Sequence, residues 1–166
     1  MTDLPYGVSE ANLNPDLAAL HEIGALLKDR VITYSYGGTD TFKEVQVGFV
    51  RRPAWFPAIS LVTGDSDFGL RSSGSGAGLR ARNAQSDFLL SIQYEDADTE
   101  QGFARMSDLK WDLGEFLARI SGAGKFYHHL TFSEIESAEL VPEDPEVDLS
   151  WGFRGLVMAA GTIHFK

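Results

Sequence analysis

The chain contains no cysteine, which excludes two classes of site. Disulfide bonds cannot form without thiols, and zinc or iron–sulfur centres held by thiolates need the same side chain. No run of about 18 apolar residues occurs, so we expect no membrane-spanning helix. The N-terminal residues also lack the basic and apolar regions of a signal peptide. With 14 Lys and Arg against 24 Asp and Glu, the net charge of -10 argues against a broad basic face for nucleic acid.

The 166 residues are enough for one domain with its own apolar core. We interpret residues 1–13 as an N-terminal arm and residues 14–166 as a single α+β domain. Asn14-Pro15-Asp16 indicates the start of a helix, with a capping Asn and a Pro in the first helical position. Apolar residues at helical spacing then predict a first helix over about 15–30.

A strand followed by a long helix is the clearest pattern in the chain. Apolar residues alternate from 88 to 95, as in a strand with one buried face. The period then changes and predicts a second helix over about 99–121, capped by Asp98 with Gln101. Its apolar stripe consists of Phe103, Met106, Leu109, Leu113, Phe116, Leu117 and Ile120.

Before this pattern, the sequence predicts a hairpin, a strand and a long loop. The β-prone residues 32–36, a Gly37-Gly38 turn and a strand over about 42–51 predict the hairpin. A short strand over 58–62 follows. Residues 64–84 are rich in Gly and Ser and predict a flexible loop, which carries three bases in an acidic protein. These bases are Arg71, Arg80 and Arg82.

The C-terminal third adds more strands. Residues 126–141 have β-like composition, and residues 149–165 alternate with apolar residues on both faces, which predicts a strand in the interior of the sheet. Two helices cannot connect this many strands in parallel. We therefore predict an α+β fold with a mainly antiparallel sheet of about five to seven strands and two main helices.

Motifs for catalysis and for metal binding are weak in this sequence. His128 and His129 are adjacent, so in a strand they point to opposite faces and do not form a metal site. The segment Gly74-Ser75-Gly76 lacks the context of a nucleophile elbow or a phosphate-binding loop. We expect a protein that is not an enzyme and has no metal or cofactor. For the three tryptophans, Trp55, Trp111 and Trp151, core packing is the default interpretation, whereas an exposed Trp would indicate an interface.

The order of features resembles the tail terminator (tail completion) proteins of long-tailed bacteriophages. The resemblance covers about residues 15–166. It depends on Phe56-Pro57-Ala58-Ile59 leading into a strand, on the strand 88–94 with the acidic turn 95–98, on the long helix, and on the final strand from Trp151 to Phe165. It implies a structural virion protein, made in the host cytoplasm, that forms a ring of usually six subunits at the head-proximal end of the tail tube.

In that family the ring stops polymerisation of the tube and provides the surface that joins the neck of the head. The implied partners are other copies of the chain, the tail tube protein and a head-completion or neck protein. DNA passes through the lumen without specific binding, and no membrane is involved. A closed ring needs a heterologous interface. Our candidates for the subunit or tube interface are Arg71, Arg80, Arg82, Lys110 and Trp111.

Two alternatives stay open. Within the same class, the chain could be another head–tail neck subunit or the subunit of the tail tube itself. From a different class, it could be a small ligand-binding or enzyme domain in which Trp111, Tyr127 and His128 line a pocket.

Overall fold

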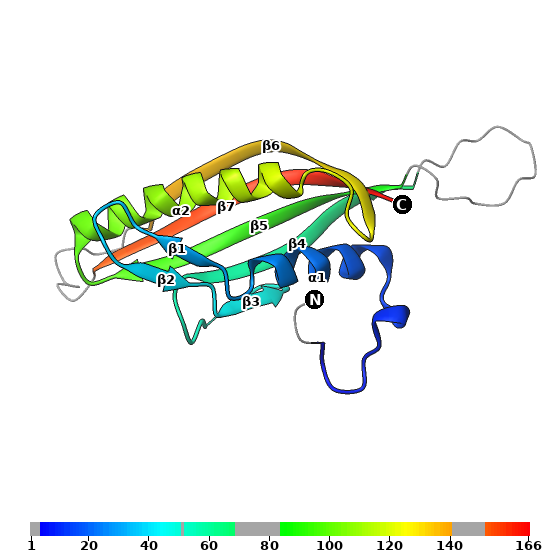
Figure 1. Cartoon of the computed structure of the whole chain (residues 1–166), viewed down its shortest axis with the longest axis horizontal. Coiled ribbons are helices and arrows are strands. Elements are labelled where there is room, and N and C mark those ends of the chain that lie inside the picture. The colour runs from blue at the N-terminus through cyan, green and yellow to red at the C-terminus, as the bar shows by residue number, and fades with distance from the viewer. Residues whose placement is uncertain (1–3, 51, 69–83, 141–151) are drawn as a thin grey trace, which may run out of the picture.

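A five-stranded sheet with both α-helices on one face forms the body of the protein (Figure 1). The computed structural model describes residues 4–50, 52–68, 84–140 and 152–166. The sheet consists of β3 (Glu44–Val47), β4 (Ala58–Asp67), β5 (Gln85–Asp96), β6 (Tyr127–Glu139) and β7 (Phe153–Phe165). Its order is β3-β4-β5-β7-β6, and only the β3–β4 pair is parallel among the described strands. The predicted α+β fold with a mainly antiparallel sheet is confirmed.

The strand and helix of the clearest sequence pattern are both present, as β5 and α2 (Thr99–Ile120). The side chain of Asp98 accepts a hydrogen bond of 2.8 Å from the backbone N–H of Gln101, which satisfies one of the free donors in the first helical turn. α2 packs on β7, β5 and β6. The helix therefore covers the half of the sheet that contains β6.

The first helix, α1 (Pro15–Leu27), begins where the sequence predicts but ends before residue 30. Asn14 caps it by accepting a 2.9 Å hydrogen bond from the N–H of Leu17. The chain leaves the helix because Asp29 adopts a left-handed backbone conformation (φ +63°) and donates its N–H to the carbonyl of Phe42. α1 packs on β3 and β4, the half of the sheet away from β6.

The predicted hairpin exists, but its second strand was wrongly placed over residues 42–51. β1 (Val31–Thr33) pairs instead with β2 (Thr39–Thr41), directly across the Gly37-Gly38 turn, in a separate two-stranded sheet. The predicted second strand is interrupted because Gly48 has a φ of +106°, a conformation that ends a regular strand. Its middle part is β3, which pairs in parallel with β4.

The predicted loop over 64–84 also begins too early. β4 continues to Asp67, where it pairs with Gln85 of β5, so residues 64–67 extend the antiparallel ladder. The pairing register of β4 with β5 shifts between Thr63 and Ser66, an irregularity that the sequence pattern does not reveal. Arg71, Arg80 and Arg82 lie outside the described residues.

The C-terminal strand lies in the interior of the sheet, as predicted. β7 pairs with β5 on one side and with β6 on the other, for example Val157 with Ile92 and with Ser137. Its odd-numbered residues are buried toward the helices, and its even-numbered residues between 156 and 164 are half-buried on the opposite face. Among the described strands, β3 and β6 therefore form the two edges.

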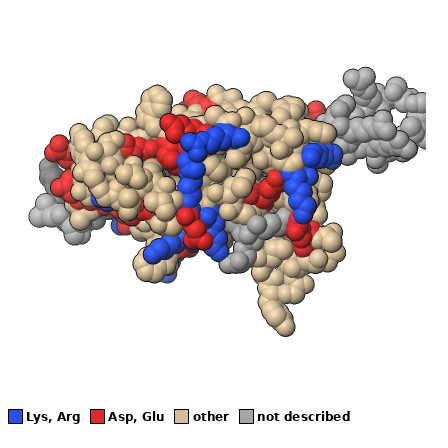
Figure 2. Space-filling view, viewed as in Figure 1, with Lys and Arg blue, Asp and Glu red and all other residues tan. Residues whose placement is uncertain are grey.

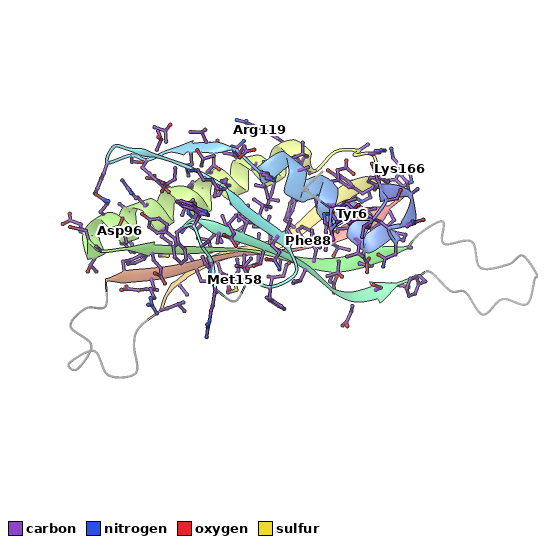
Figure 3. All side chains as sticks on the ribbon, turned by 90° about the horizontal axis from the view of Figure 1, so that it is seen from below. Tyr6, Phe88, Asp96, Arg119, Met158 and Lys166 are labelled. Carbon is purple, nitrogen blue, oxygen red and sulfur yellow. The ribbon has the colours of Figure 1, made fainter. Side chains whose placement is uncertain are left out.

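A single apolar core fills the space between the helices and the sheet. It includes Ile23 of α1, Leu109 of α2, Leu90 of β5 and Ile163 of β7, all fully buried. The turned view places α1 and α2 on one side of the sheet and labels Met158 on the other (Figure 3). The sheet face that carries Met158 has no helix over it among the described residues.

Candidate assembly surface

Helix α2 has three faces, and each has a different environment. The first face packs into the core through residues with less than 5% exposure: Met106, Leu109, Leu113, Phe116 and Leu117. Successive helical residues are rotated by about 100°, so residues three and four apart share a face. This arrangement confirms most of the predicted apolar stripe.

The second face of α2 is polar and holds the β1–β2 hairpin. Asp108 accepts hydrogen bonds from both the backbone N–H (2.8 Å) and the hydroxyl (2.6 Å) of Ser35, which lies in the turn of the hairpin. Asp112 pairs with Arg30, just before β1. The guanidinium of Arg105 donates to the carbonyl of Gly37 (3.4 Å). These contacts fix the hairpin against the helix.

A buried polar cluster lies beside this hairpin. Tyr94 donates a 2.7 Å hydrogen bond to Asp96 and accepts one of 3.3 Å from Arg105. Burial raises the pKa of Tyr94 to about 12, helped by the bond to Asp96 and opposed by Arg105. Burial alone would raise the pKa of Asp96, but hydrogen bonds from Asp98 N–H, Tyr94 and Gln101 outweigh it and lower that pKa. These hydrogen bonds connect the end of β5 to the first turns of α2.

The third face of α2 carries two large exposed side chains. Trp111 is 71% exposed and Phe103 is 61% exposed, although the sequence pattern had placed Phe103 in the core stripe and core packing was the default interpretation for Trp111. The placement of Phe103 in the core is therefore wrong, and for Trp111 the exposed alternative holds. Gly102 takes the core position at the start of the helix, where the ring of Phe153 packs so closely that a Cβ atom would overlap it.

Trp111 borders an apolar groove of about 470 Å³ between α2 and the edge strand β6. The other lining residues on α2 are Lys110, Gly114, Glu115 and Ala118, and Ile135 comes from β6. Two small residues thus lie between the indole ring and the edge strand. Exposed Trp is characteristic of interfaces, because its large flat ring buries much area at little entropic cost.

The structure thus brings together two of the five residues predicted for the interface. Lys110 and Trp111 both line the groove. The three arginines of the predicted loop, and Trp151 of the final strand, lie outside the described residues. Trp55, for which core packing was also the default interpretation, is 59% exposed and lies 5.0 Å from Nζ of Lys43.

The residues proposed for a ligand pocket do not come together. Tyr127 is buried in the core, where its hydroxyl donates to the carbonyl of Ile120 (3.1 Å). His128 is exposed, and neither residue lines the groove that contains Trp111. That grouping of Trp111, Tyr127 and His128 was wrong, because sequence order does not reveal that Tyr127 faces the interior.

The histidines of β6 lie on the surface, as the sequence suggested. His129 stacks on His164 of β7 with 4.0 Å between ring centroids. Burial and the neighbouring His129 lower the pKa of His164. Within the described parts of the chain, no group of three His, Asp or Glu side chains is placed to hold a metal ion. Neither described α-helix is long and apolar enough to cross a membrane.

The N-terminal arm forms a second exposed surface, which the sequence analysis did not identify. Residues 5–8 form a tight turn in which the N–H of Val8 donates to the carbonyl of Pro5 (3.0 Å) and Gly7 has a φ of +82°. Tyr6, the second residue of this turn, is fully exposed. Gly7, in the third position of the turn where a type II turn needs a positive φ, was the available signal.

This turn lies at the opposite edge of the sheet from the groove. Pro5 lines an open, polar groove together with β3, with His21 of α1 and with Lys28, the C-cap residue of that helix. Lys43 lines it as well. Figure 1 shows the arm at the bottom, beyond α1 and β3, and β6 at the top. The molecule therefore carries two unlike surfaces on its two sheet edges.

Comparison with protein-family models and with curated proteins finds no match for this chain. The inference of function therefore depends on the sequence and the structure.

Proposed function

We propose that this protein is a structural subunit of the tail terminator type, which forms a ring at the head-proximal end of a bacteriophage tail tube. The ring stops polymerisation of the tube and presents the surface to which the neck of the head joins. Its subunits, usually six in such rings, contact one another, the tail tube protein and a head-completion or neck protein. In this proposal the protein is part of the virion and is not an enzyme.

The observation that carries the proposal is the exposed apolar groove at the β6 edge. An isolated small domain gains nothing from leaving Trp111 and Phe103 exposed, whereas an assembly subunit buries such residues against its neighbour. The two different surfaces at β3 and β6 suit a heterologous interface, in which unlike patches meet and a ring can close. The order of sequence features that resembles tail terminators agrees with this role.

The charge distribution is compatible with DNA passing through such a ring. Figure 2 shows Lys and Arg side chains interspersed with carboxylates on the described part of the visible face, without an extended basic patch. A continuous cationic surface would hold the phosphate backbone by releasing counterions, which would impede passage. With a net charge of -10, the subunit favours loose contact with DNA.

The native mass of the purified protein over a concentration range, with negative-stain images of the same samples, tests the proposal. We expect closed rings, or a monomer that forms rings when tail tubes are added and stops their growth. Long tubes formed by the protein alone would identify a tube subunit instead. A monomer at every concentration that does not bind tail tubes would refute the structural role.

A further inference from the structure

We infer that the N-terminal turn of one copy docks into the groove between α2 and β6 of a second copy, with the Tyr6 side chain as its anchor. This inference specifies the contact between subunits and depends on the self-assembly proposed above. It brings together the exposed aromatic side chain at one sheet edge and the apolar groove at the other.

The turn holds the backbone of Tyr6 and leaves its side chain fully exposed. The 3.0 Å hydrogen bond between Val8 and Pro5 closes the turn, and Pro5 restricts the backbone before Tyr6. The following 3₁₀ helix, Glu10–Asn12, is capped by Ser9. Lys125 then ties Glu10 to the body of the protein through a 2.6 Å ion pair. A backbone held in this way loses little conformational entropy on binding, so the main chain of the turn is preorganised.

The groove has the shape and chemistry that a phenol side chain needs. Gly114 and Ala118 are small and lie beside Trp111, so a ring can approach the helix closely and pack against the indole. Ile135 supplies an aliphatic surface from β6. Lys110 and Glu115 are the polar residues of the lining and can bind the phenol hydroxyl. The groove therefore offers both apolar contact and a hydrogen-bond partner.

The two edges also have complementary charge. The surface around the turn contains two lysines and one acid, Lys28, Lys43 and Glu44, which line the groove beside Pro5. At the opposite edge, Glu115 lines the groove and Glu139 is exposed further along the same face of β6, whereas Glu134 and Glu136 lie beside Met158 on the other face of the sheet. The lysines beside the turn and the carboxylates of Glu115 and Glu139 favour the arm-to-groove arrangement.

Because the two surfaces lie at opposite edges of the sheet, the turn that binds in the groove must come from a second copy of the chain. Pro5 lies beside the edge strand β3, whereas Ile135 belongs to the edge strand β6, with three strands between them. A turn at one edge cannot fill the groove at the other edge of the same sheet. Contact between copies is then heterologous and repeats from subunit to subunit, which generates a ring when the rotation closes.

Disulfide cross-linking tests this contact directly, since the chain has no cysteine of its own. One protein carries Tyr6→Cys, and a second, enlarged by a fused tag, carries Ala118→Cys. The two are mixed under mild oxidation and separated by mass without reductant. We expect a mixed dimer of one tagged and one untagged chain. The matched control replaces Tyr6→Cys by Tyr36→Cys, which places the thiol at an exposed tyrosine of the hairpin turn.

The control pair should give no mixed dimer above the level of random collision. Equal yields from the two pairs would overturn the arm-to-groove contact. A second readout is the native mass of the Tyr6→Ala and Tyr36→Ala variants over a concentration range. We expect Tyr6→Ala to weaken self-association on the order of tenfold or more and Tyr36→Ala to leave it unchanged. If the Tyr6→Cys and Ala118→Cys proteins assemble into rings but give no mixed disulfide dimer, this contact is refuted while the proposed function stands. A protein that neither cross-links nor assembles, with or without tubes, would refute both.

Discussion

Arg30 and Asp112 form a two-bond ion pair between the segment that follows α1 and the middle of α2. Nε of Arg30 donates to Oδ2 of Asp112 (3.1 Å), and Nη2 donates to Oδ1 (2.8 Å). The two side chains are only 22% and 19% exposed. The hydrogen bonds to Asp112 outweigh the effect of burial and raise the pKa of Arg30. This pair fixes the hairpin strand β1 to the helix that carries the groove.

We predict that Asp112→Ala lowers the free energy of unfolding by about 1–3 kcal/mol, because it leaves a largely buried guanidinium without its carboxylate. The matched control is Glu95→Ala, which breaks a single-bond ion pair to Arg154 of 2.9 Å with side chains 40% and 45% exposed. Exposed pairs contribute about 1 kcal/mol or less. Urea unfolding of both variants measures the difference, and equal effects would contradict the structural role of Arg30–Asp112.

Substitution by alanine should change the free energy of unfolding in opposite directions at two glycines of α2. Alanine forms helix better than glycine by about 1 kcal/mol. At Gly114, an added Cβ would lie 3.5 Å from Ile135, an ordinary contact, so Gly114→Ala should stabilise the protein. At Gly102, the Cβ would overlap the buried ring of Phe153, and overpacking of this kind costs about 1–3 kcal/mol.

Thermal or urea unfolding of Gly102→Ala and Gly114→Ala should therefore give shifts of opposite sign. Gly114→Ala also narrows the groove, so it should weaken self-association while it raises the free energy of unfolding. If Gly102→Ala proved the more stable of the two, the close packing of Phe153 on α2 would be wrong.

The buried Tyr94 predicts a loss of stability at alkaline pH. Its pKa is raised to about 12, chiefly by burial, whereas tyrosine in an unfolded chain has a pKa of about 10. The folded state holds the proton more tightly, so the stabilisation is complete below pH 10 and is lost as the pH rises from about 10 to about 12. Over that range the free energy of unfolding should fall by about 1.4 kcal/mol per pH unit for each such group.

Urea unfolding at several pH values between 8 and 11.5 measures this slope. Tyr94→Phe removes one titrating group and should make the slope shallower. Part of the pH dependence should remain in that variant, because burial also raises the pKa of Tyr127 to about 12. Identical slopes for the wild type and Tyr94→Phe would show that Tyr94 does not titrate with folding.

The His129–His164 stack predicts a loss of stability in mildly acidic solution that is smaller than the alkaline loss from Tyr94. Burial and the adjacent His129 lower the pKa of His164 below the value of about 6.5 for an unfolded chain. The neutral ring is favoured in the folded state, so this stabilisation is present above pH 6.5 and is lost as the pH falls. His164→Gln should reduce the fall in the free energy of unfolding between pH 7 and pH 5, and an unchanged fall would exclude His164 as its source.

The sequence alone determined the local elements, because their signals are local. Asn14 and Asp98 each cap the helix that follows, and a cap needs only a donor two or three residues away. Apolar residues at both the odd and the even positions of the final strand predicted a strand inside the sheet, and β7 lies there between β5 and β6. The α+β class followed from the small number of helices.

Only the tertiary structure decided which residues meet across the chain. The stripe of α2 could not show that Gly102 rather than Phe103 lies in the core, because the close approach of Phe153 comes from a strand distant in sequence. Lys110 and Trp111 were identified as candidates from the sequence, but the groove exists because Ile135 of β6 lies beside them. Tyr6 became significant only when its turn was found at the opposite sheet edge. Packing between distant segments has no sequence period, and it decides which apolar residues stay exposed for a partner.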